Sequence, residues 1–402
     1  MSLPPLKPKR GLSPTQMQYL ATAWVALSII LGLGAFGAIY FGGGGFATAP
    51  APTAQPTTAL PVAPVFTLAP SPTPEPGLAL PPLTSFMLGG QAIHGGIPSS
   101  GKMHEARMTW VKLQAQDLSV DFGPAIENAH KLGFRILISV VDKSDNKFKI
   151  TSPDYQQTFA NYLVTLAGQG ADAIEVWNEE NIDREWPSGQ ISGQSYAQLL
   201  QFVYPQIKAA NSNTIVISGA PSPTGFFGGR CTPQGCDDKP FIEAMAAAGA
   251  FNYADCIGIH YNEGLISPSQ SSGDPRDFSE HYTRYYQTMV DTYWNASGGT
   301  KPLCFTEIGY LSGEEWGYLP DNFLWKPPIN LTVAEHAQYL AEAARLSRDQ
   351  GKVRLMIVFN VDFTVYPEAG VSPGDPQAGY AILRPDGSCP ACETLKAVMA
   401  TP

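Results

Sequence analysis

Between residue 83 and the C-terminus, short apolar runs alternate with longer stretches that favour helices. The apolar runs are too continuous for a half-exposed sheet, which predicts parallel strands buried on both faces. Eight strands are predicted, at residues 85–88, 108–113, 134–141, 171–177, 214–218, 256–260, 303–307 and 353–359. Helices are predicted at residues 125–132, 153–167, 196–210, 241–248, 278–294, 333–348 and 393–399. This α/β alternation over residues 83–402 predicts a single (β/α)8 TIM barrel.

The N-terminal region contains a further apolar stretch that is much longer than any of the predicted strands. Residues 20–41 carry no charge, and residues 1–19 before them contain Lys7, Lys9 and Arg10. The stretch is long enough to cross a bilayer core of roughly 30 Å as one helix. Because positive flanks stay in the cytoplasm, we expect a single-pass anchor in the cell membrane with a cytoplasmic N-terminus. The barrel would then be extracellular.

A cleaved signal peptide is the alternative for this segment. Ala47-Thr48-Ala49 has the small-residue form of a cleavage site, but Pro50 follows it. The apolar stretch also exceeds the ~7–15 residues usual for a signal peptide, which favours the uncleaved anchor. Residues 42–82 are rich in Pro, Ala and Thr with Glu75 as their one charge, so a disordered linker is expected.

The net charge of the chain limits the binding partners to be expected, and the cysteine positions predict disulfides. A formal net charge of −10 argues against nucleic acid. Two close cysteine pairs in predicted loops are expected to form disulfides in an oxidising compartment: Cys231 with Cys236, and Cys389 with Cys392. Cys256 and Cys304 lie in predicted strands, where free buried thiols are expected. The chain has no metal-ligand spacing, phosphate loop or nucleotide motif, so we expect no cofactor and no metal.

Two predicted strands end in carboxylates. The run Ile-Glu-Val-Trp-Asn-Glu-Glu-Asn at 174–181 delivers Glu179 at the end of the fourth strand, and Thr306-Glu307 ends the seventh. The carboxyl ends of barrel strands form the mouth in which active sites lie. Glycoside cleavage uses two such carboxyls, ~5–5.5 Å apart in retaining enzymes and ~6.5–9.5 Å apart in inverting ones.

Trp177-Asn178-Glu179, together with Thr306-Glu307, resembles the clan A glycoside hydrolases near families 5 and 39. The resemblance extends over residues 83–402 in the order of elements. It implies that Glu179 is the acid/base, that Glu307 is the nucleophile and that configuration is retained. It also implies that Asn178 binds the sugar 2-hydroxyl.

Some positions depart from the clan pattern. The clan often places a His and a Tyr at the exit of the sixth strand with one residue between them, whereas His260 and Tyr261 are adjacent. The clan has an Arg on the second strand and a Trp after the eighth; here Lys112 is the nearest basic residue and the eighth strand ends in Phe359. The predicted substrate-binding residues are Asn178, His260, Tyr261, Trp177, Glu180, Trp316, Trp325 and Lys112. Trp177 and Glu180 are also expected to raise the pKa of Glu179.

The sequence therefore predicts a membrane-anchored, retaining β-glycosidase that cleaves extracellular oligo- or polysaccharide by double displacement. A catalytically inactive carbohydrate-binding barrel is the alternative, because the clan's Arg and Trp are missing. A surface scaffold that binds protein is a third reading, since fold alone does not define function.

Overall fold

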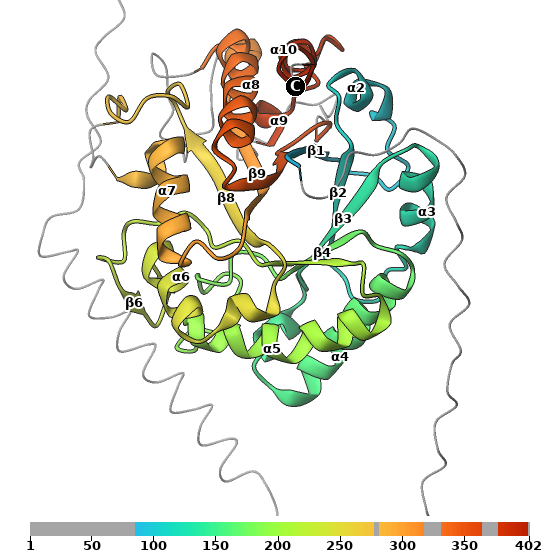
Figure 1. Ribbon diagram of the computed structural model, residues 1–402, viewed down its shortest axis with the longest axis vertical. Coiled ribbons are helices and arrows are strands. Elements are labelled where there is room, and N and C mark those ends of the chain that lie inside the picture. Colours follow the sequence, from blue (N-terminus) through green and yellow to red (C-terminus); the bar gives the residue numbers. More distant parts are fainter. Residues whose placement is uncertain (1–84, 277–280, 317–330, 364–376, 401–402) are drawn as a thin grey trace, which may run out of the picture. The chain divides into compact units, whose positions relative to one another are not determined.

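A computed structural model describes residues 85–276, 281–316, 331–363 and 377–400 (Figure 1). The chain divides into two compact units, 1–67 and 68–402, and every described residue belongs to the second. The predicted anchor at 20–41 and the linker at 42–82 lie outside the described residues. Over the ranges given above, no helix combines the length and the apolar character needed to cross a membrane.

Eight parallel strands form the centre of the molecule, as predicted. Their order is β5-β4-β3-β2-β1-β10-β9-β8. They are β1 (Met87–Gln91), β2 (Trp110–Ala115), β3 (Arg135–Val140), β4 (Ala173–Val176), β5 (Ile215–Ser218), β8 (Ile257–Gly264), β9 (Leu303–Tyr310) and β10 (Val353–Val358). A parallel bridge between Ile217 and Cys256 joins β5 to the start of β8, and the Ser218 N–H donates to the Cys256 carbonyl at 3.1 Å. The sheet is thus closed into a TIM barrel.

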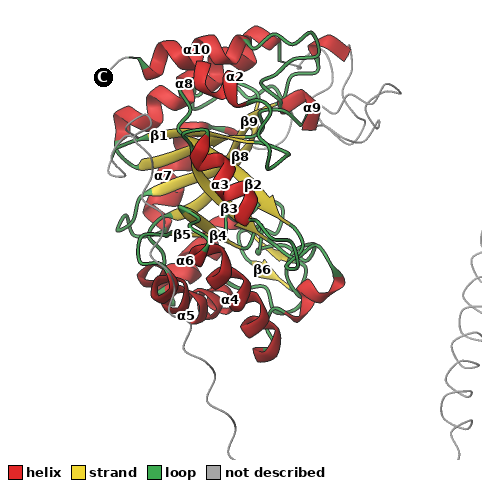
Figure 2. Ribbon diagram, turned by 90° about the vertical axis from the view of Figure 1, so that its right-hand side faces the viewer, coloured by secondary structure: helices red, strands yellow, loops and turns green. Residues whose placement is uncertain are grey.

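Helices surround the strands in Figure 1. They are α2 (Ser100–Glu105), α3 (Gly123–Lys131), α4 (Pro153–Gly168), α5 (Gly193–Ala210), α6 (Asp238–Ala247), α7 (Tyr286–Ala296), α8 (Val333–Gln350), α9 (Gln377–Tyr380) and α10 (Pro390–Met399). Figure 2 shows α8, α10 and α2 above the strands and α4, α5 and α6 below them, on the outside of the barrel. Short 3-10 turns are η1 (Asp145–Lys149), η2 (Ala250–Tyr253), η3 (Tyr282–Arg284) and η4 (Glu314–Trp316). A small antiparallel hairpin, β6 (Cys231–Thr232) with β7 (Gly235–Cys236), follows β5.

The core has two parts because each barrel strand is buried on both faces. Inward-facing residues form a compact cluster: Met87, Trp110, Leu137, Ala173, Ile215, Ile217, Cys256, Cys304, Leu355 and Ile357. A larger apolar cluster fills the space between strands and helices. Further along the inner face of β2 and β4, two residues on from the cluster, stand Lys112 and Glu175, both fully buried. The barrel interior is therefore apolar toward the N-terminal ends of the strands and polar toward their C-terminal ends, which form the mouth.

Three disulfides are present in the described residues. Cys231–Cys236 closes the β6–β7 hairpin and Cys389–Cys392 spans the first turn of α10, which confirms both predicted pairs. The prediction of free thiols at Cys256 and Cys304 is wrong. These two residues are bonded to each other with their Cα atoms 6.0 Å apart. Both side chains face the barrel interior from adjacent strands, and sequence alone gives no sign of this juxtaposition.

Candidate active site

Glu307 is turned into the barrel by an irregularity in β9. This strand pairs Phe305 with Ile259 of β8, but the next pair is Glu307 with His260. Thr306 is therefore an extra residue, and the register of β9 against β10 shifts at the same place. Strict alternation from the inward-facing Cys304 would have sent the Glu307 side chain outward. The bulge re-aims it toward the mouth.

Lys112 of β2 lies beneath Glu307. Its Nζ is 3.0 Å from Glu307 Oε1 and 3.4 Å from Glu175 Oε2, and it donates a hydrogen bond to the Thr306 carbonyl at 3.1 Å. Burial opposes the charge of Lys112, but the two carboxylates raise its pKa. Burial likewise opposes ionisation of Glu307, yet Lys112 and His260 hold the pKa of Glu307 below its usual value. Glu307 is thus a buried, ionised carboxylate.

Glu179 follows β4 through a tight turn. Trp177 and Glu179 have φ of 77° and 51°, in the left-handed region that side chains other than glycine rarely adopt. The Glu179 N–H donates to the Ala220 carbonyl, beyond β5, at 3.0 Å. Such backbone conformations cost about 1–3 kcal/mol each and are often found at functional sites.

His260 of β8 brings the two glutamates together. Its Nδ1 lies 3.5 Å from Glu179 Oε1 and 4.0 Å from Glu307 Oε2. These two oxygens are therefore at most about 7.5 Å apart, the sum of the two distances. The ring is fully buried, and the nearby carboxylates raise the pKa of His260 although burial opposes this. Glu179, Glu307, His260 and Lys112 thus form one connected group.

Asn262, which the sequence analysis missed, belongs to this group, whereas Tyr261 does not. Asn262 Nδ2 donates to Glu307 Oε2 at 3.3 Å. The Tyr261 hydroxyl points the other way and donates to the Arg284 carbonyl at 3.1 Å. Two-residue alternation from His260 could have identified Asn262, since residues 260 and 262 share one face of a strand.

Arg184, in the loop after β4, is a second residue that the sequence analysis missed. Its guanidinium forms an ion pair with Glu179, and its Nε lies 3.3 Å from Glu185 Oε1, while two-thirds of its side chain remains exposed. Burial favours the neutral form of Glu179, but His260, whose Nδ1 lies 3.5 Å from Glu179 Oε1, and the charges of Arg184 and Lys143 lower the pKa of Glu179 to about 2. The pKa expected from the sequence, above the ordinary value, is therefore not found.

The neighbours of Glu179 explain this difference. The Trp177 indole is buried edge-on against Phe159 and Trp186, so it lies in the apolar core and not against Glu179 or a substrate. Glu180 is also fully buried, and burial together with nearby carboxylates raises the pKa of Glu180 well above its usual value. A protonated Glu180 adds no charge that would raise the pKa of Glu179.

The remaining candidates are placed as follows. Asn178 is buried, and its amide oxygen has no hydrogen-bond partner among the described residues. Trp316 is the last residue of η4, and Trp325 lies outside the described residues. Phe359, at the end of β10, packs against Tyr380 with ring centroids 5.6 Å apart. Among the residues that the structure describes, no three His, Cys, Asp or Glu side chains are grouped to hold a metal ion.

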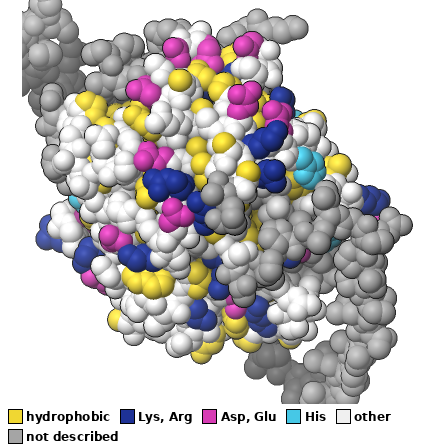
Figure 3. All heavy atoms as spheres, turned by 45° about the horizontal axis from the view of Figure 1, so that its top comes forward, with side chains coloured by type: hydrophobic (Ala, Val, Ile, Leu, Met, Phe, Trp, Pro, Cys, Tyr) yellow, Lys and Arg dark blue, Asp and Glu magenta, His cyan; other side chains and the backbone are white. Residues whose placement is uncertain are grey.

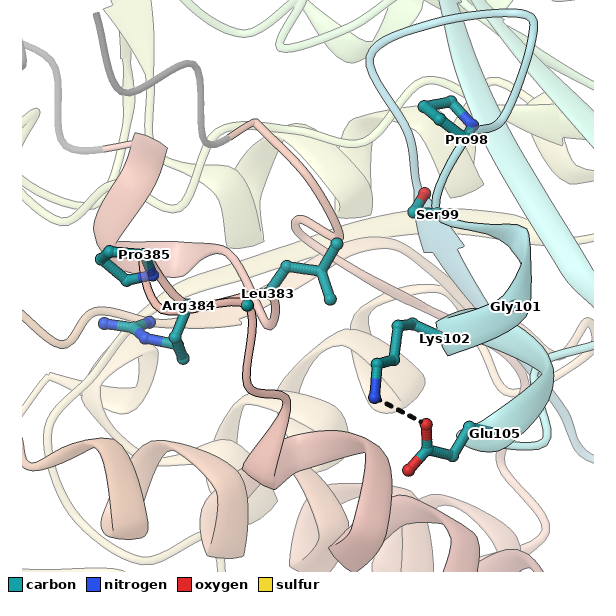
Figure 4. A pocket seen from close by; sticks show the side chains of 9 residues that line it. Pro98, Ser99, Gly101, Lys102, Glu105, Leu383, Arg384 and Pro385 are labelled. Carbon is teal, nitrogen blue, oxygen red and sulfur yellow. Dashed lines mark hydrogen bonds and ion pairs between the residues drawn. The ribbon is translucent and has the colours of Figure 1, made fainter. Parts of the chain in front are cut away.

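A hollow of about 590 Å³ lies apart from these carboxylates (Figure 4). It is lined by Pro98, Ser99, Gly101, Lys102, Glu105, Leu383, Arg384, Pro385 and Gly387. Its pair of opposite charges, Lys102 and Glu105, is a partly exposed ion pair between neighbouring turns of α2, 2.9 Å apart. Nothing in this hollow resembles a catalytic pair, so the group around His260 is the better candidate.

No protein-family model matches the chain, and no curated protein matches its sequence. Solved structures do match. An endo-1,4-β-mannanase from Rhizomucor miehei is 10% identical, with a TM-score of 0.50, and the match covers 79% of this chain and 96% of that one. The chain shares its barrel fold with glycoside hydrolases.

Two further structures match at slightly lower TM-scores. A GH128 endo-β-1,3-glucanase from Sorangium cellulosum is 18% identical, with a TM-score of 0.49, covering 77% of this chain and 97% of that one. A family 17 β-1,3-glucanosyltransferase from R. miehei is 16% identical, also at 0.49, covering 78% and 97%. The mannanase match, with the eight-stranded parallel barrel, confirms at the level of the fold the resemblance predicted from the sequence.

Proposed function

We propose that this protein is a retaining β-glycoside hydrolase that acts on extracellular oligo- or polysaccharide, with Glu307 as nucleophile and Glu179 as acid/base. The observation that carries the proposal is the meeting of the two carboxyls at His260. Their nearest oxygens are at most about 7.5 Å apart. This bound covers the ~5–5.5 Å of retaining enzymes and the short end of the ~6.5–9.5 Å of inverting ones, so the retaining course is taken from the clan resemblance. The barrel fold shared with a mannanase supports the same reaction class.

The proposed reaction has two steps. Glu307 attacks the anomeric carbon and forms a glycosyl ester, while Glu179 gives its proton to the departing glycosidic oxygen. A water molecule then gives a proton to Glu179 and attacks the anomeric carbon, which releases Glu307 and the sugar. Lys112 and Asn262 keep the Glu307 carboxylate ionised and oriented. The amide oxygen of Asn178, which has no hydrogen-bond partner in the described part of the chain, is suited to accept a hydrogen bond from the sugar 2-hydroxyl.

The proposed location is outside the cell, attached to the membrane through residues 20–41 with the N-terminus in the cytoplasm. Three disulfides fit an oxidising compartment. Carbohydrate is the proposed partner, and the net charge of −10 disfavours nucleic acid.

The test is hydrolysis of β-glucan and β-mannan oligosaccharides and of aryl β-glycosides. We expect Glu307→Gln to lose at least ~10³-fold in kcat, because no covalent intermediate can form. Glu179→Gln should lose most on substrates with poor leaving groups, which need the proton. Glu127→Gln, an exposed carboxylate of α3, is the control and should match the wild type. NMR should show the β-anomer first, and first release of the α-anomer would contradict double displacement.

A carbohydrate-binding barrel without catalysis is the second candidate. The ion pair of Glu179 with Arg184 favours it, because a carboxyl with a pKa near 2 is not ready to give a proton. This candidate predicts that the wild type binds an oligosaccharide without cleaving any member of the panel. Titration calorimetry beside the hydrolysis assay separates the two.

A further inference from the structure

The position of Arg184 marks one side of the candidate site. A general acid must place its carboxyl against the glycosidic oxygen that it protonates. One Glu179 oxygen faces His260 inside the barrel, and the other is paired with the largely exposed Arg184. The sugars that depart with the protonated glycosidic oxygen would therefore lie beside the Arg184 guanidinium or displace it. This step rests on the function proposed above.

Phe148 is connected to Arg184 by a series of contacts. It belongs to η1, in the loop after β3, and Lys147 Nζ stands 5.2 Å from the centre of its ring. The same Nζ is 3.4 Å from Glu185, which also pairs with Arg184. Phe148 as a whole residue is 43% exposed. An exposed aromatic ring therefore lies on the β3 side of the loop that carries Arg184.

Phe226 lies on the opposite side, in the loop after β5. It is 75% exposed and packs on Phe227 with ring centroids 4.5 Å apart. Phe227 covers Gly235, where an added Cβ would meet its ring at 2.1 Å. Gly235 in turn pairs with Ile182, two residues before Arg184. The loops after β4 and β5 are thus joined, and Phe226 is linked to this junction through its contact with Phe227.

These two rings stand out from the rest of the surface. The exposed large apolar side chains of the described residues are Ile93, Val120, Phe148 and Phe226. All four follow barrel strands, namely β1, β2, β3 and β5, so they belong to the loops at the mouth. Only the two aromatic ones flank β4, the strand that delivers Glu179. Flat aromatic faces are suited to stack on the apolar faces of sugar rings.

We propose that Phe148 and Phe226 are stacking platforms for the sugar units on the leaving side of the cleaved bond, with Arg184 between them. The ligand class is a neutral β-linked chain with at least two sugar units beyond the bond. Such a subsite would make the enzyme prefer chains to single glycosides. The hydroxyls of the stacked sugars would also form hydrogen bonds with the Arg184 guanidinium. These bonds would draw the guanidinium away from Glu179.

The test compares a chain with a single glycoside. The chain is whichever of laminaripentaose, cellopentaose and mannopentaose the full-length enzyme cleaves fastest; the single glycoside is the nitrophenyl β-glycoside of the same sugar. For Phe148→Ala and Phe226→Ala, the ratio of the two kcat/KM values should fall roughly three- to tenfold each, as expected for one lost ring contact. Phe226→Trp, which keeps an aromatic ring at this position, should have the wild-type ratio. Ile93→Ala and Val120→Ala, matched exposed side chains away from β4, should keep the wild-type ratio.

The cleavage pattern gives a second measurement. With the reducing end of the pentaose labelled with ¹⁸O, the two alanine variants should shift cleavage toward bonds that leave fewer sugars on the reducing side. An unchanged ratio and an unchanged pattern in both variants would overturn the subsite while hydrolysis itself continues. A wild type that hydrolyses no substrate would instead overturn the proposed function, and the subsite with it.

Discussion

Glu179 and Glu307 differ in the cation that forms an ion pair with each. Glu307 is paired from below by a lysine that is completely buried, whereas Glu179 is paired from the side by an arginine that is mostly in solvent. The first cation cannot leave without unfolding part of the barrel. The second can move by rotation of its own side chain. We therefore expect the charge on Glu307 to be permanent and the charge on Glu179 to depend on what occupies the mouth.

Lys112→Met tests the first pairing. Lys112 lowers the pKa of Glu307, so its removal should raise that pKa. A nucleophile must be ionised, and the acid limb of kcat/KM against pH should therefore move to higher pH. Removing one partner of a buried pair should also cost about 3–5 kcal/mol of stability, measured by urea unfolding. Lys112→Arg keeps the charge and serves as the control; a limb that stays in place or moves to lower pH would contradict the assignment.

Arg184→Gln tests the second pairing. Arg184 helps to lower the pKa of Glu179 to about 2, although His260 and Lys143 contribute as well. Its loss should raise that pKa. Because Glu179 must be protonated in the first step, the basic limb of kcat/KM should move to higher pH. Arg184→Lys should leave this limb close to the wild-type position. If Arg184→Gln moves only KM, Arg184 binds substrate without setting the proton of Glu179.

The eight strands could be predicted from the sequence, but only part of the candidate active site could. Apolar runs identify all eight strands within a few residues, because a strand buried on both faces is mostly apolar; polar residues such as Lys112 and Glu175 stand only toward the mouth. Glu179 and Glu307 could be chosen because each ends such a run. The bulge at Thr306 could not be foreseen, since nothing in the residue type marks an extra position. Arg184 was missed because its role comes from a loop conformation.

The Cys256–Cys304 disulfide belongs to this scale, since it links the start of β8 to β9. It closes 48 residues, so a chain-entropy argument predicts that Cys256→Ala with Cys304→Ala lowers the free energy of unfolding by about 4 kcal/mol. The Cys231–Cys236 pair closes only 5 residues, and the same argument predicts about 2 kcal/mol. Urea unfolding of the two double variants measures both. A larger loss for the hairpin pair would contradict this ranking.

The surface of the barrel unit is of mixed character. On the face shown in Figure 3, acidic and basic side chains are interspersed among apolar and uncharged ones. Figure 2 shows β6 and α9, which follow β5 and β10, at the same end of the strands. The loops at that end carry Glu179, Arg184 and the exposed apolar side chains. The net charge of −10 suits a neutral ligand better than a polyanion.

Acid stability of the whole barrel should depend on His336. This histidine of α8 is buried, its Nε2 lies 3.3 Å from the Tyr380 carbonyl, and burial and the charge of Arg384 lower its pKa to about 3. Between pH 6.5 and 3 the unfolded chain binds a proton that the folded chain does not. Stability should therefore fall as pH falls, by about 1.4 kcal/mol per unit from this group.

His336→Gln should flatten this part of the stability curve, measured by urea unfolding at a series of pH values. His104→Gln, on the exposed side of α2, is the matched control and should keep the wild-type slope. Equal slopes in all three proteins would show that other groups control acid unfolding.

The additional residue at position 306 has a consequence for anyone who aligns this chain with other barrels. An alignment without a gap there would match Glu307 to an outward position and assign the proposed nucleophile to the wrong column. Engineers who transplant β9 into another scaffold face the same difficulty, because the carboxyl will face the helices unless Thr306 travels with it. The assignment of Glu307 as the proposed nucleophile thus depends on counting residues as well as on their chemistry.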